Sequence, residues 1–524
     1  MGKVDVSNME LKDVEKCCCV VTLTEAFSTK APVSFSGVLV RPGVVICTGF
    51  PFFPFVTHKK LSARCLLRHN FRDALQISVT FPSGRHVEAN PCGLTHECPP
   101  GRNTTTTGQW EAELLMLVNC LEFKQAFRAL FQEADGWRFH GDEEEELLGD
   151  ADHLSWFGVL KTGEHLKPGA AWEKSSALRK GVPVLACGSP FGSLCVDLFI
   201  STISGGIISN LAGEDNAVIL TDARCVPGTE GGGLFALNDS GGVRLIGVIV
   251  SPFGWKGNEW IGLTLVCSVQ TIFRNVLRCA NAEDPFRDVC LRPAEIVPAP
   301  DSMAGPYPVV GLVDSGQQWG SGVLVTSDLV LTCRHVVKGK STVAMKFHHR
   351  DRVLDSVGDV IFATKTSSPY DVAVVQLRQP FPGFQVPQMA QKFHPGERLL
   401  VVSYGGLGGR CGPSLTCGVL SKAISVNRRP VMLQTTCAVQ AGASGGAVVR
   451  ASSGELIGMV ASNTRDMTAK VTYPHLNFCI PVTALQGPLR RFQQQKDSTA
   501  FEALDTTEED VRRVWRIQDA HSKL

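Results

Sequence analysis

A short sequence occurs twice in this chain, and its repetition limits the possible folds more than any other feature. Residues 36–46 read SGVLVRPGVVI and residues 321–331 read SGVLVTSDLVL, with six identities in eleven positions. Two further matches follow in the same order: PGTEGGGLF at 227–235 with AGASGGAVV at 441–449, and RLIGVIVSP at 244–252 with ELIGMVASN at 455–463. Three ordered matches over spans of similar size predict a tandem duplication of one folding unit.

The repeated unit reads as β structure. Short β-branched runs broken by Gly, Pro and Asn dominate from about residue 20 to 270 and again from about 305 to 485. Runs of four to eight residues with frequent turn signals favour sandwiches or closed barrels, so we expect an all-β fold. The boundaries we predict are a first unit at 12–279, a proline-rich linker at 280–306, a second unit at 307–490, and a carboxy-terminal helix and tail at 491–524.

Composition excludes several classes of function. Lys plus Arg number 51 and Asp plus Glu 50, so the net charge of +1 gives no basis for binding nucleic acid or a membrane surface. No apolar run is long enough for a transmembrane helix, and the amino terminus does not read as a secretory signal. The 19 cysteines are odd in number and irregularly spaced. They indicate reduced thiols rather than disulfides or zinc sites, and we expect no metal and no cofactor.

Three residues of the second unit have the order and the context of a nucleophilic site. His335 lies in TCRHV after an apolar strand, Asp371 precedes the strand of YDVAVVQL, and Ser444 lies in the glycine-rich turn AGASGG. A serine hydroxyl needs a base within hydrogen-bond reach, which His335 would supply, and Asp371 would orient the imidazole. Gly442 and Gly445 allow a tight turn, in which the N–H groups of Gly442 and Ser444 would form an oxyanion hole.

The first unit lacks these groups. By the SGVLV match Phe50 takes the place of His335, and by the glycine-rich match Glu230 takes that of Ser444. The best counterpart of the aspartate is Trp156 in SWFGVL. Because phenylalanine cannot accept a proton, we expect no second catalytic site.

The second unit resembles the trypsin-like serine proteases in their shorter DegP/HtrA-like form. TCRHV, YDVAVVQL and GASGG match the histidine, aspartate and serine motifs of that family. Val336 stands where secreted members carry a disulfide cysteine, and Ala443 replaces the Asp or Asn before the serine. The resemblance implies two tandem trypsin-like double β-barrels, the first catalytically degenerate and the second a serine endopeptidase.

The chain ends in Ser522, Lys523 and Leu524, a tripeptide read by the peroxisomal import receptor. We therefore expect the peroxisomal matrix as its location. With this tripeptide the chain is similar to a peroxisomal family of such proteases. That resemblance implies removal of leader peptides from imported matrix enzymes such as thiolase, processing of other β-oxidation enzymes, and self-cleavage.

Specificity is less constrained by the sequence. The residue six places before the serine floors the primary pocket in trypsin-like folds, and the strand after ELIGM would form its wall; these residues are Ala438, Val460, Ala461 and Ser462. They favour a small or apolar residue. The turn-rich stretch 87–109 would suit self-cleavage, with Cys92-Gly93 as the candidate bond.

The alternative function is a pseudoprotease that binds peptides or acts as a chaperone of imported proteins. The first unit shows that this chain tolerates loss of the catalytic groups, whereas the second unit retains all of them. The composition permits a homo-oligomer without requiring one. The first unit could serve in packing, autoinhibition or substrate presentation.

Overall fold

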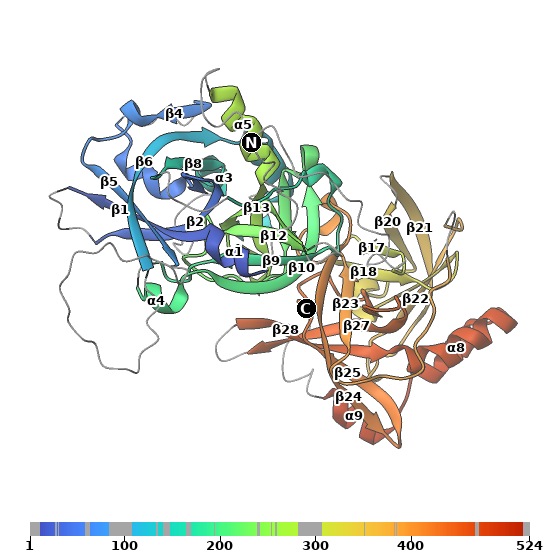
Figure 1. The fold of residues 1–524 in the computed structure, drawn as a ribbon. Coiled ribbons are helices and arrows are strands. Elements are labelled where there is room, and N and C mark those ends of the chain that lie inside the picture. The colour runs from blue at the N-terminus through green and yellow to red at the C-terminus, as the bar shows by residue number, and fades with distance from the viewer. Residues whose placement is uncertain are drawn as a thin grey trace, which may run out of the picture.

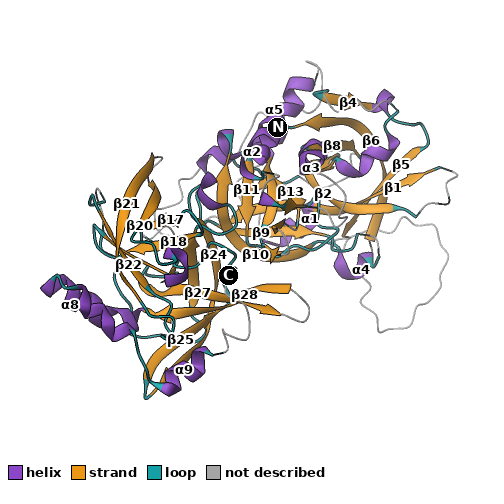
Figure 2. Cartoon of the chain, turned by 180° about the vertical axis from the view of Figure 1, so that it is seen from behind, coloured by secondary structure: helices purple, strands orange, loops and turns teal. Residues whose placement is uncertain are grey.

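The computed structural model consists of two β-rich halves that lie side by side (Figures 1 and 2). We call residues 11–280 the amino-terminal half and residues 307–516 the carboxy-terminal half. The structure describes residues 11–516 except for 27–28, 30, 58–62, 83–106, 133–134, 140–146, 164–168, 193, 238–241, 253, 257–258, 281–306, 350–351, 382, 384 and 467–470. None of the helices in the described ranges has the length and apolar character needed to cross a bilayer.

The amino-terminal half contains two closed antiparallel barrels. The first has the order β6-β5-β1-β2-β3-β8, closed by pairing of β8 with β6, and β4 extends it at β6. The second has the order β10-β11-β16-β13-β12-β9. The strands of the first barrel are β1 (Cys18–Glu25), β2 (Val33–Arg41), β3 (Val44–Thr48), β4 (Cys65–Leu67), β5 (Leu75–Pro82), β6 (Thr107–Asn119) and β8 (Trp156–Lys161); those of the second are β9 (Pro183–Gly188), β10 (Thr202–Ala212), β11 (Val218–Thr221), β12 (Gly233–Leu237), β13 (Val243–Ser251) and β16 (Thr264–Ser268).

The carboxy-terminal half repeats this plan. One barrel has the order β17-β18-β19-β22-β21-β20 and the other the order β23-β24-β25-β28-β27-β26. Their strands are β17 (Val310–Asp314), β18 (Trp319–Leu324), β19 (Leu329–Thr332), β20 (Thr342–His349), β21 (Arg352–Ala363), β22 (Ala373–Leu377), β23 (Arg398–Ser403), β24 (Ser414–Val426), β25 (Arg429–Thr435), β26 (Ala447–Arg450), β27 (Leu456–Asp466) and β28 (Val471–Pro481).

The remaining elements are short. A small sheet, β15-β14-β7, is formed by β7 (Trp137–Arg138), β14 (Trp255–Lys256) and β15 (Glu259–Trp260). The α-helices are α1 (Leu11–Cys17), α2 (Leu121–Leu130), α3 (Leu147–Leu154), α4 (Val196–Phe199), α5 (Val269–Cys279), α7 (Arg334–Val337), α8 (Val482–Gln495) and α9 (Glu509–Trp515).

The predicted all-β tandem barrels are confirmed, and the duplication extends to the helices. In each half the last barrel strand runs directly into a helix, β16 into α5 and β28 into α8. We expected the pattern to turn helical after residue 490, but α8 begins at Val482. The sequence did not indicate this earlier start because Gly487 and Pro488 are poor helix formers. Packing of Leu485 and Leu489 into the core stabilises the helix.

The two halves meet where β10 and β24 lie together, and each half places a side chain in the hydrophobic core of the other. Ile207 of the amino-terminal half belongs to the hydrophobic core of the carboxy-terminal half, and Leu407 belongs to the main core of the amino-terminal half. Asp222 accepts hydrogen bonds from the backbone N–H groups of Ile207 at 2.7 Å and Cys417 at 2.6 Å. These contacts join the four barrels into one body.

Candidate active site

His335 and Asp371 meet at the ends of two paired strands. Thr332, the last residue of β19, is the direct partner of Ala373, the first residue of β22. His335 follows β19 in the short helix α7, and Asp371 lies two residues before the start of β22. His335 Nδ1 lies 2.5 Å from Asp371 Oδ2, and the backbone N–H of His335 donates to Asp371 Oδ1 at 3.1 Å. With the proton on Nδ1, Nε2 is left as the basic nitrogen.

The environment of Asp371 keeps its carboxylate ionised. The side chain is buried, which opposes ionisation and raises the pKa. The hydrogen bond from His335 and its charge when protonated, together with Arg334, outweigh burial and hold the pKa of Asp371 below its usual value. Arg334 Nε lies 3.8 Å from Asp371 Oδ1. An ionised Asp371 favours the imidazolium form that His335 must reach during acid–base catalysis.

Ser444 lies in a turn held by the other barrel and by β18. Its carbonyl accepts from Ser321 N at 2.8 Å, and the next residue, Gly445, donates to Val460 O at 2.8 Å. Gly320 separates this carbonyl from the His335 helix, since a Cβ there would lie 3.0 Å from Ser444 O and 2.6 Å from Val336 Cγ2. The turn and the helix are therefore neighbours.

The hydroxyl of Ser444 is buried and has no hydrogen-bond partner among the residues that the structure describes. The hydrogen bond to His335 that we expected is therefore not formed. Catalytic hydrogen bonds of this kind are often long in structures without substrate and tighten when it binds. Buried hydroxyls in native proteins are usually hydrogen-bonded, and a catalytic role is one of the reasons for which one is left unpaired.

The turn before Ser444 leaves two N–H groups available. In the described residues no hydrogen bond engages the backbone N–H of Gly442 or of Ser444, while Ser321 Oγ donates to Gly442 O at 2.8 Å. Gly442 has φ of +89°, and a Cβ there would lie 2.1 Å from the Trp319 ring. Both backbone conformation and packing therefore require glycine. Sequence reasoning missed Trp319 and the bonds of Ser321, although Ser321 opens the repeated SGVLV.

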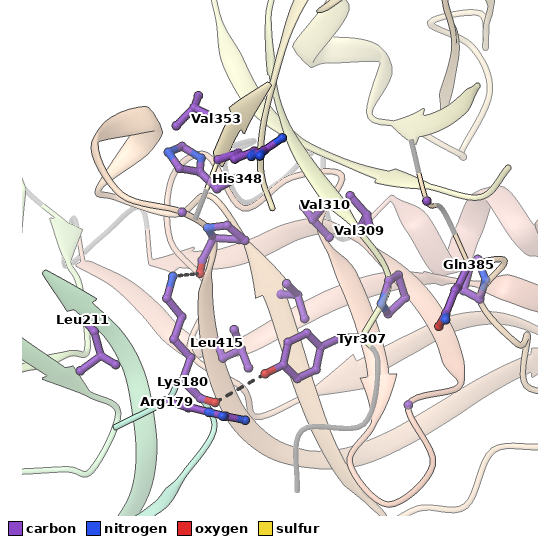
Figure 3. Close-up of a pocket in the computed structure, with 18 of the residues that line it drawn as sticks. Arg179, Lys180, Leu211, Tyr307, Val309, Val310, His348, Val353, Gln385 and Leu415 are labelled. Atoms are coloured by element: carbon purple, nitrogen blue, oxygen red, sulfur yellow. Dashed lines mark hydrogen bonds between the residues drawn. The ribbon is translucent and has the colours of Figure 1, made fainter. Parts of the chain in front are cut away.

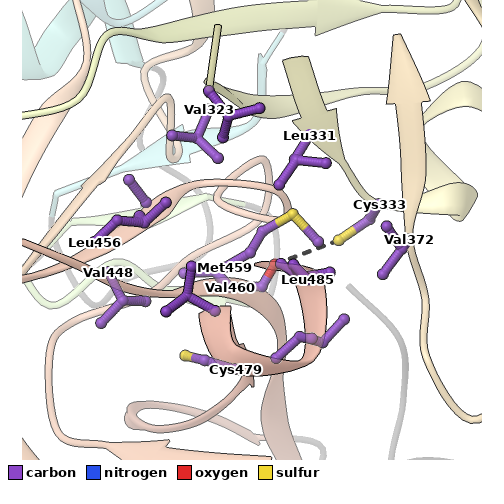
Figure 4. Close-up of a cluster of buried hydrophobic side chains, with 14 of the residues drawn as sticks. Val323, Leu331, Cys333, Val372, Val448, Leu456, Met459, Val460, Cys479 and Leu485 are labelled. Carbon is purple, nitrogen blue, oxygen red and sulfur yellow. Dashed lines mark hydrogen bonds between the residues drawn. The ribbon is translucent and has the colours of Figure 1, made fainter. Parts of the chain in front are cut away.

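The four residues predicted for the specificity pocket are all buried, and none carries a charge. Val460 and Ala461 belong to the hydrophobic core, where Cys333 Sγ donates to Val460 O at 3.3 Å (Figure 4). Ala438 O accepts from a neighbouring threonine hydroxyl at 2.7 Å, and Ser462 is 3% exposed. Their role in specificity stays a prediction.

Two further polar residues near these strands were not found from the sequence. Asn463 follows Ser462 on β27, and His475 lies on β28; Nδ2 of the first and Nε2 of the second are buried without a hydrogen-bond partner in the described structure. Burial, then the charge of Arg224, lowers the pKa of His475, so its ring is neutral at pH 7. No motif signals either residue.

The amino-terminal half has the same turn with different chemistry. Ser36 N donates to Glu230 O at 2.9 Å and Ser36 Oγ to Gly228 O at 2.7 Å, the same two bonds that Ser321 makes beside Ser444. Here, however, the Glu230 carboxylate accepts the N–H of Gly228 at 2.7 Å. The N–H that corresponds to one proposed oxyanion donor is thus already occupied.

Strand register identifies the other two counterparts. The β2–β3 and β3–β8 ladders match the β18–β19 and β19–β22 ladders. In the matched ladders Phe50 takes the position of His335, and Trp156 takes that of Asp371. The Phe53 ring packs on Trp156 with centroids 5.8 Å apart. Aromatic side chains thus occupy the positions of the base and its carboxylate. The amino-terminal half is therefore catalytically degenerate.

Cys333, His335 and Asp371 bring three potential ligand atoms within 4.8 Å of one another. Burial, then the nearby charge of Asp371, raises the pKa of the Cys333 thiol well above its usual value. The group therefore stays protonated, which makes it a poor metal ligand. All 16 cysteines in the described part of the chain are free.

A cavity of about 1310 Å³ lies between the halves (Figure 3). It is lined from the amino-terminal half by Lys180 and from the carboxy-terminal half by Tyr307, His348 and Leu415. Lys180 Nζ donates to Pro413 O at 2.8 Å. None of His335, Asp371 and Ser444 lines it, so this cavity is separate from the candidate active site.

Comparison with known proteins identifies the class of enzyme. Residues 320–459 match the model of the trypsin-like peptidase domain. The serine protease Do-like HtrB of Bacillus subtilis is 30% identical over 36% of this chain and 40% of its own length. Together with the barrels, these matches make the chain a trypsin-like serine endopeptidase.

Two relatives match the chain almost end to end. The peroxisomal leader peptide-processing protease of Homo sapiens is 38% identical over 97% of both chains, and that of Mus musculus is 37% identical over 98% of both. The chain belongs to the family of peroxisomal leader peptide-processing proteases. Three predicted features lie outside the described residues. They are the targeting tripeptide, the linker from residue 281 onward and the candidate cleavage bond Cys92-Gly93.

Proposed function

We propose that this protein is a peroxisomal serine endopeptidase that removes leader peptides from imported matrix enzymes, with Ser444 as nucleophile. The observation that carries the proposal is the 2.5 Å contact between His335 Nδ1 and Asp371 Oδ2, together with a buried Ser444 hydroxyl in the neighbouring turn that has no hydrogen-bond partner among the described residues. A base, its orienting carboxylate and an available nucleophile are the parts that acyl transfer requires.

The reaction follows from these groups. His335 Nε2 removes the hydroxyl proton as Ser444 Oγ attacks the scissile carbonyl, and the resulting oxyanion accepts from the N–H groups of Gly442 and Ser444. His335 then gives that proton to the leaving amine, which departs and leaves an acyl-enzyme. A water molecule then attacks the ester as His335 takes its proton, and His335 returns that proton to Ser444 Oγ as the ester C–O bond breaks and the acid leaves. Asp371 stays ionised throughout.

Substrate and location are proposed from the family. The relatives' names support peroxisomal leader peptides as substrates and the peroxisome as the location. Thiolase and other β-oxidation enzymes are the substrates we propose, with Ser522–Leu524 bound by the import receptor. Removal of these three residues should leave the protein in the cytosol while its activity in vitro is unchanged. A truncated protein that still enters peroxisomes without a partner would contradict this address.

The test of activity uses purified full-length wild type and Ser444→Ala with a peroxisomal thiolase precursor, read by intact mass. The proposal expects one new amino terminus on the precursor with wild type only. Ser453→Ala, which removes an exposed serine of the same half, is the matched control and should cut as wild type does. Binding of the precursor without cleavage by any of the three would favour a peptide-binding pseudoprotease.

The same incubation tests self-cleavage. Cleavage between Cys92 and Gly93 would give a fragment that begins at Gly93, in wild type and not in Ser444→Ala. A fragment with another first residue would remove this bond from the proposal while leaving the nucleophile in place.

A further inference from the structure

A segment of the amino-terminal half reaches the turn that carries Ser444. We call residues 255–256 and 259–262 the bridging segment; it contains β14 and β15 and extends the small sheet of β7. β15 packs on β28 of the carboxy-terminal half. The Trp260 ring lies against the ring of His475, with centroids 6.2 Å apart. The degenerate amino-terminal half therefore contacts the carboxy-terminal half near the candidate active site.

The first contact is made through Gln440, four residues before Ser444. Its Nε2 donates to the carbonyl of Ile261 at 2.5 Å, and its Oε1 accepts from Gly406 N at 3.2 Å. The side chain is buried, and the backbone carbonyl of Gln440 accepts from Ala443 N at 3.0 Å, which closes the turn. The amide thus ties the start of the oxyanion turn to the bridging segment.

The second contact is made through Lys256. Its Nζ donates to Gly406 O at 2.7 Å and lies over the rings of Trp319, at 5.4 Å from the centroid, and Trp137, at 5.5 Å. Trp319 in turn covers Gly442 so closely that no side chain fits there. One cation of the amino-terminal half therefore holds the ring that packs on the proposed oxyanion donor.

We propose that the bridging segment positions the oxyanion turn, with Lys256 and Gln440 as positioning residues, so that the degenerate half acts as a built-in activator of the other. This inference rests on the proposed role of Ser444. A turn with glycine at 442 and 445 has many accessible conformations, and donors stabilise an oxyanion only when they are fixed before the reaction. Contacts at both Gln440 and Trp319 restrict that freedom.

The test compares full-length Lys256→Met and Gln440→Met, which keep side-chain length and remove the polar contacts. Lys174→Met, at an exposed lysine of the amino-terminal half, is the control. Each protein is treated with a fluorophosphonate, which reacts with an activated serine, loses fluoride and places its polar phosphonyl oxygen at the oxyanion position. We expect the rate of labelling at Ser444 and kcat for a leader peptide to fall by about 10- to 100-fold in both variants, with KM within about threefold of wild type.

Thermal unfolding distinguishes positioning from loss of fold. The inference requires that Lys256→Met melts like Lys174→Met while labelling slowly; labelling at the wild-type rate in Lys256→Met and Gln440→Met would overturn it. A fall in labelling matched by the same fall in folded fraction in both variants would also overturn it. Wild type that is not labelled at Ser444 would instead refute the proposed function, so the two failures are separable.

Discussion

Glu230 stands in the amino-terminal half where Ser444 stands in the carboxy-terminal half. The carbonyl of each accepts from the first serine of SGVLV, at 2.9 Å and 2.8 Å respectively. The Glu230 side chain folds back on Gly228 N, whereas no hydrogen bond from the described residues engages the equivalent N–H, that of Gly442. The duplication has thus kept the turn in both halves and the chemistry in one.

Loss of the Glu230 carboxylate should weaken the amino-terminal half without affecting catalysis directly. Glu230→Ala leaves Gly228 N without its acceptor, so we expect a loss of about 1–3 kcal/mol in unfolding free energy. Denaturant unfolding measures this change, and labelling of Ser444 in the folded protein is the control. Glu230→Ser added to Ser444→Ala should stay inactive, because Phe50 and Trp156 supply no base.

Asp371→Asn should lower kcat by a factor on the order of 10⁴, because the amide no longer fixes the His335 tautomer or stabilises its imidazolium form. The pH dependence of stability should change as well. The folded-state pKa of Asp371 lies below its unfolded value, so its contribution is present above the unfolded pKa and is lost as pH falls through the folded one. Acid unfolding curves of wild type and Asp371→Asn should therefore converge at low pH.

The buried thiols should resist alkylation at neutral pH. Burial raises the pKa of Cys479 to about 12 and that of Cys333 well above its usual value, whereas Cys195 is exposed. Iodoacetamide should modify Cys195 in the native protein and leave the other two intact until denaturant is added. Rapid modification of Cys333 in the native state, read by peptide mass, would contradict this packing.

Because Ile207 and Leu407 each pack in the core of the opposite half, we expect the two halves to unfold together. Leu407→Ala should destabilise the protein by about 2–4 kcal/mol, because Leu407 is 6% exposed in the core of the other half. Leu194→Ala, at a leucine that is 79% exposed, should change little. Equal effects of the two changes in a denaturant titration would show that Leu407 does not anchor the interface.

Sequence predicted the tandem barrels and the class of enzyme because its signals are local. SGVLV recurs, and residues such as His335 and Ser444 lie within short motifs. Contacts between distant segments leave no such signal. Nothing near Lys256 indicates that its ammonium group reaches Trp319, and nothing near Ile207 or Leu407 indicates that each packs in the opposite half. The start of α8 was missed because tertiary packing overrides the low helix propensity of Gly487 and Pro488.

The most direct measurement is the mass of peptides from full-length protein after reaction with a fluorophosphonate, for wild type, Ser444→Ala and Ser453→Ala. If His335 activates Ser444, wild type and Ser453→Ala should each carry one phosphonyl adduct, on Ser444. Ser444→Ala should carry none. Leader-peptide cleavage should fall in parallel, by a factor on the order of 10⁶ in Ser444→Ala. An adduct on another serine, or substantial cleavage by Ser444→Ala, would contradict the assignment.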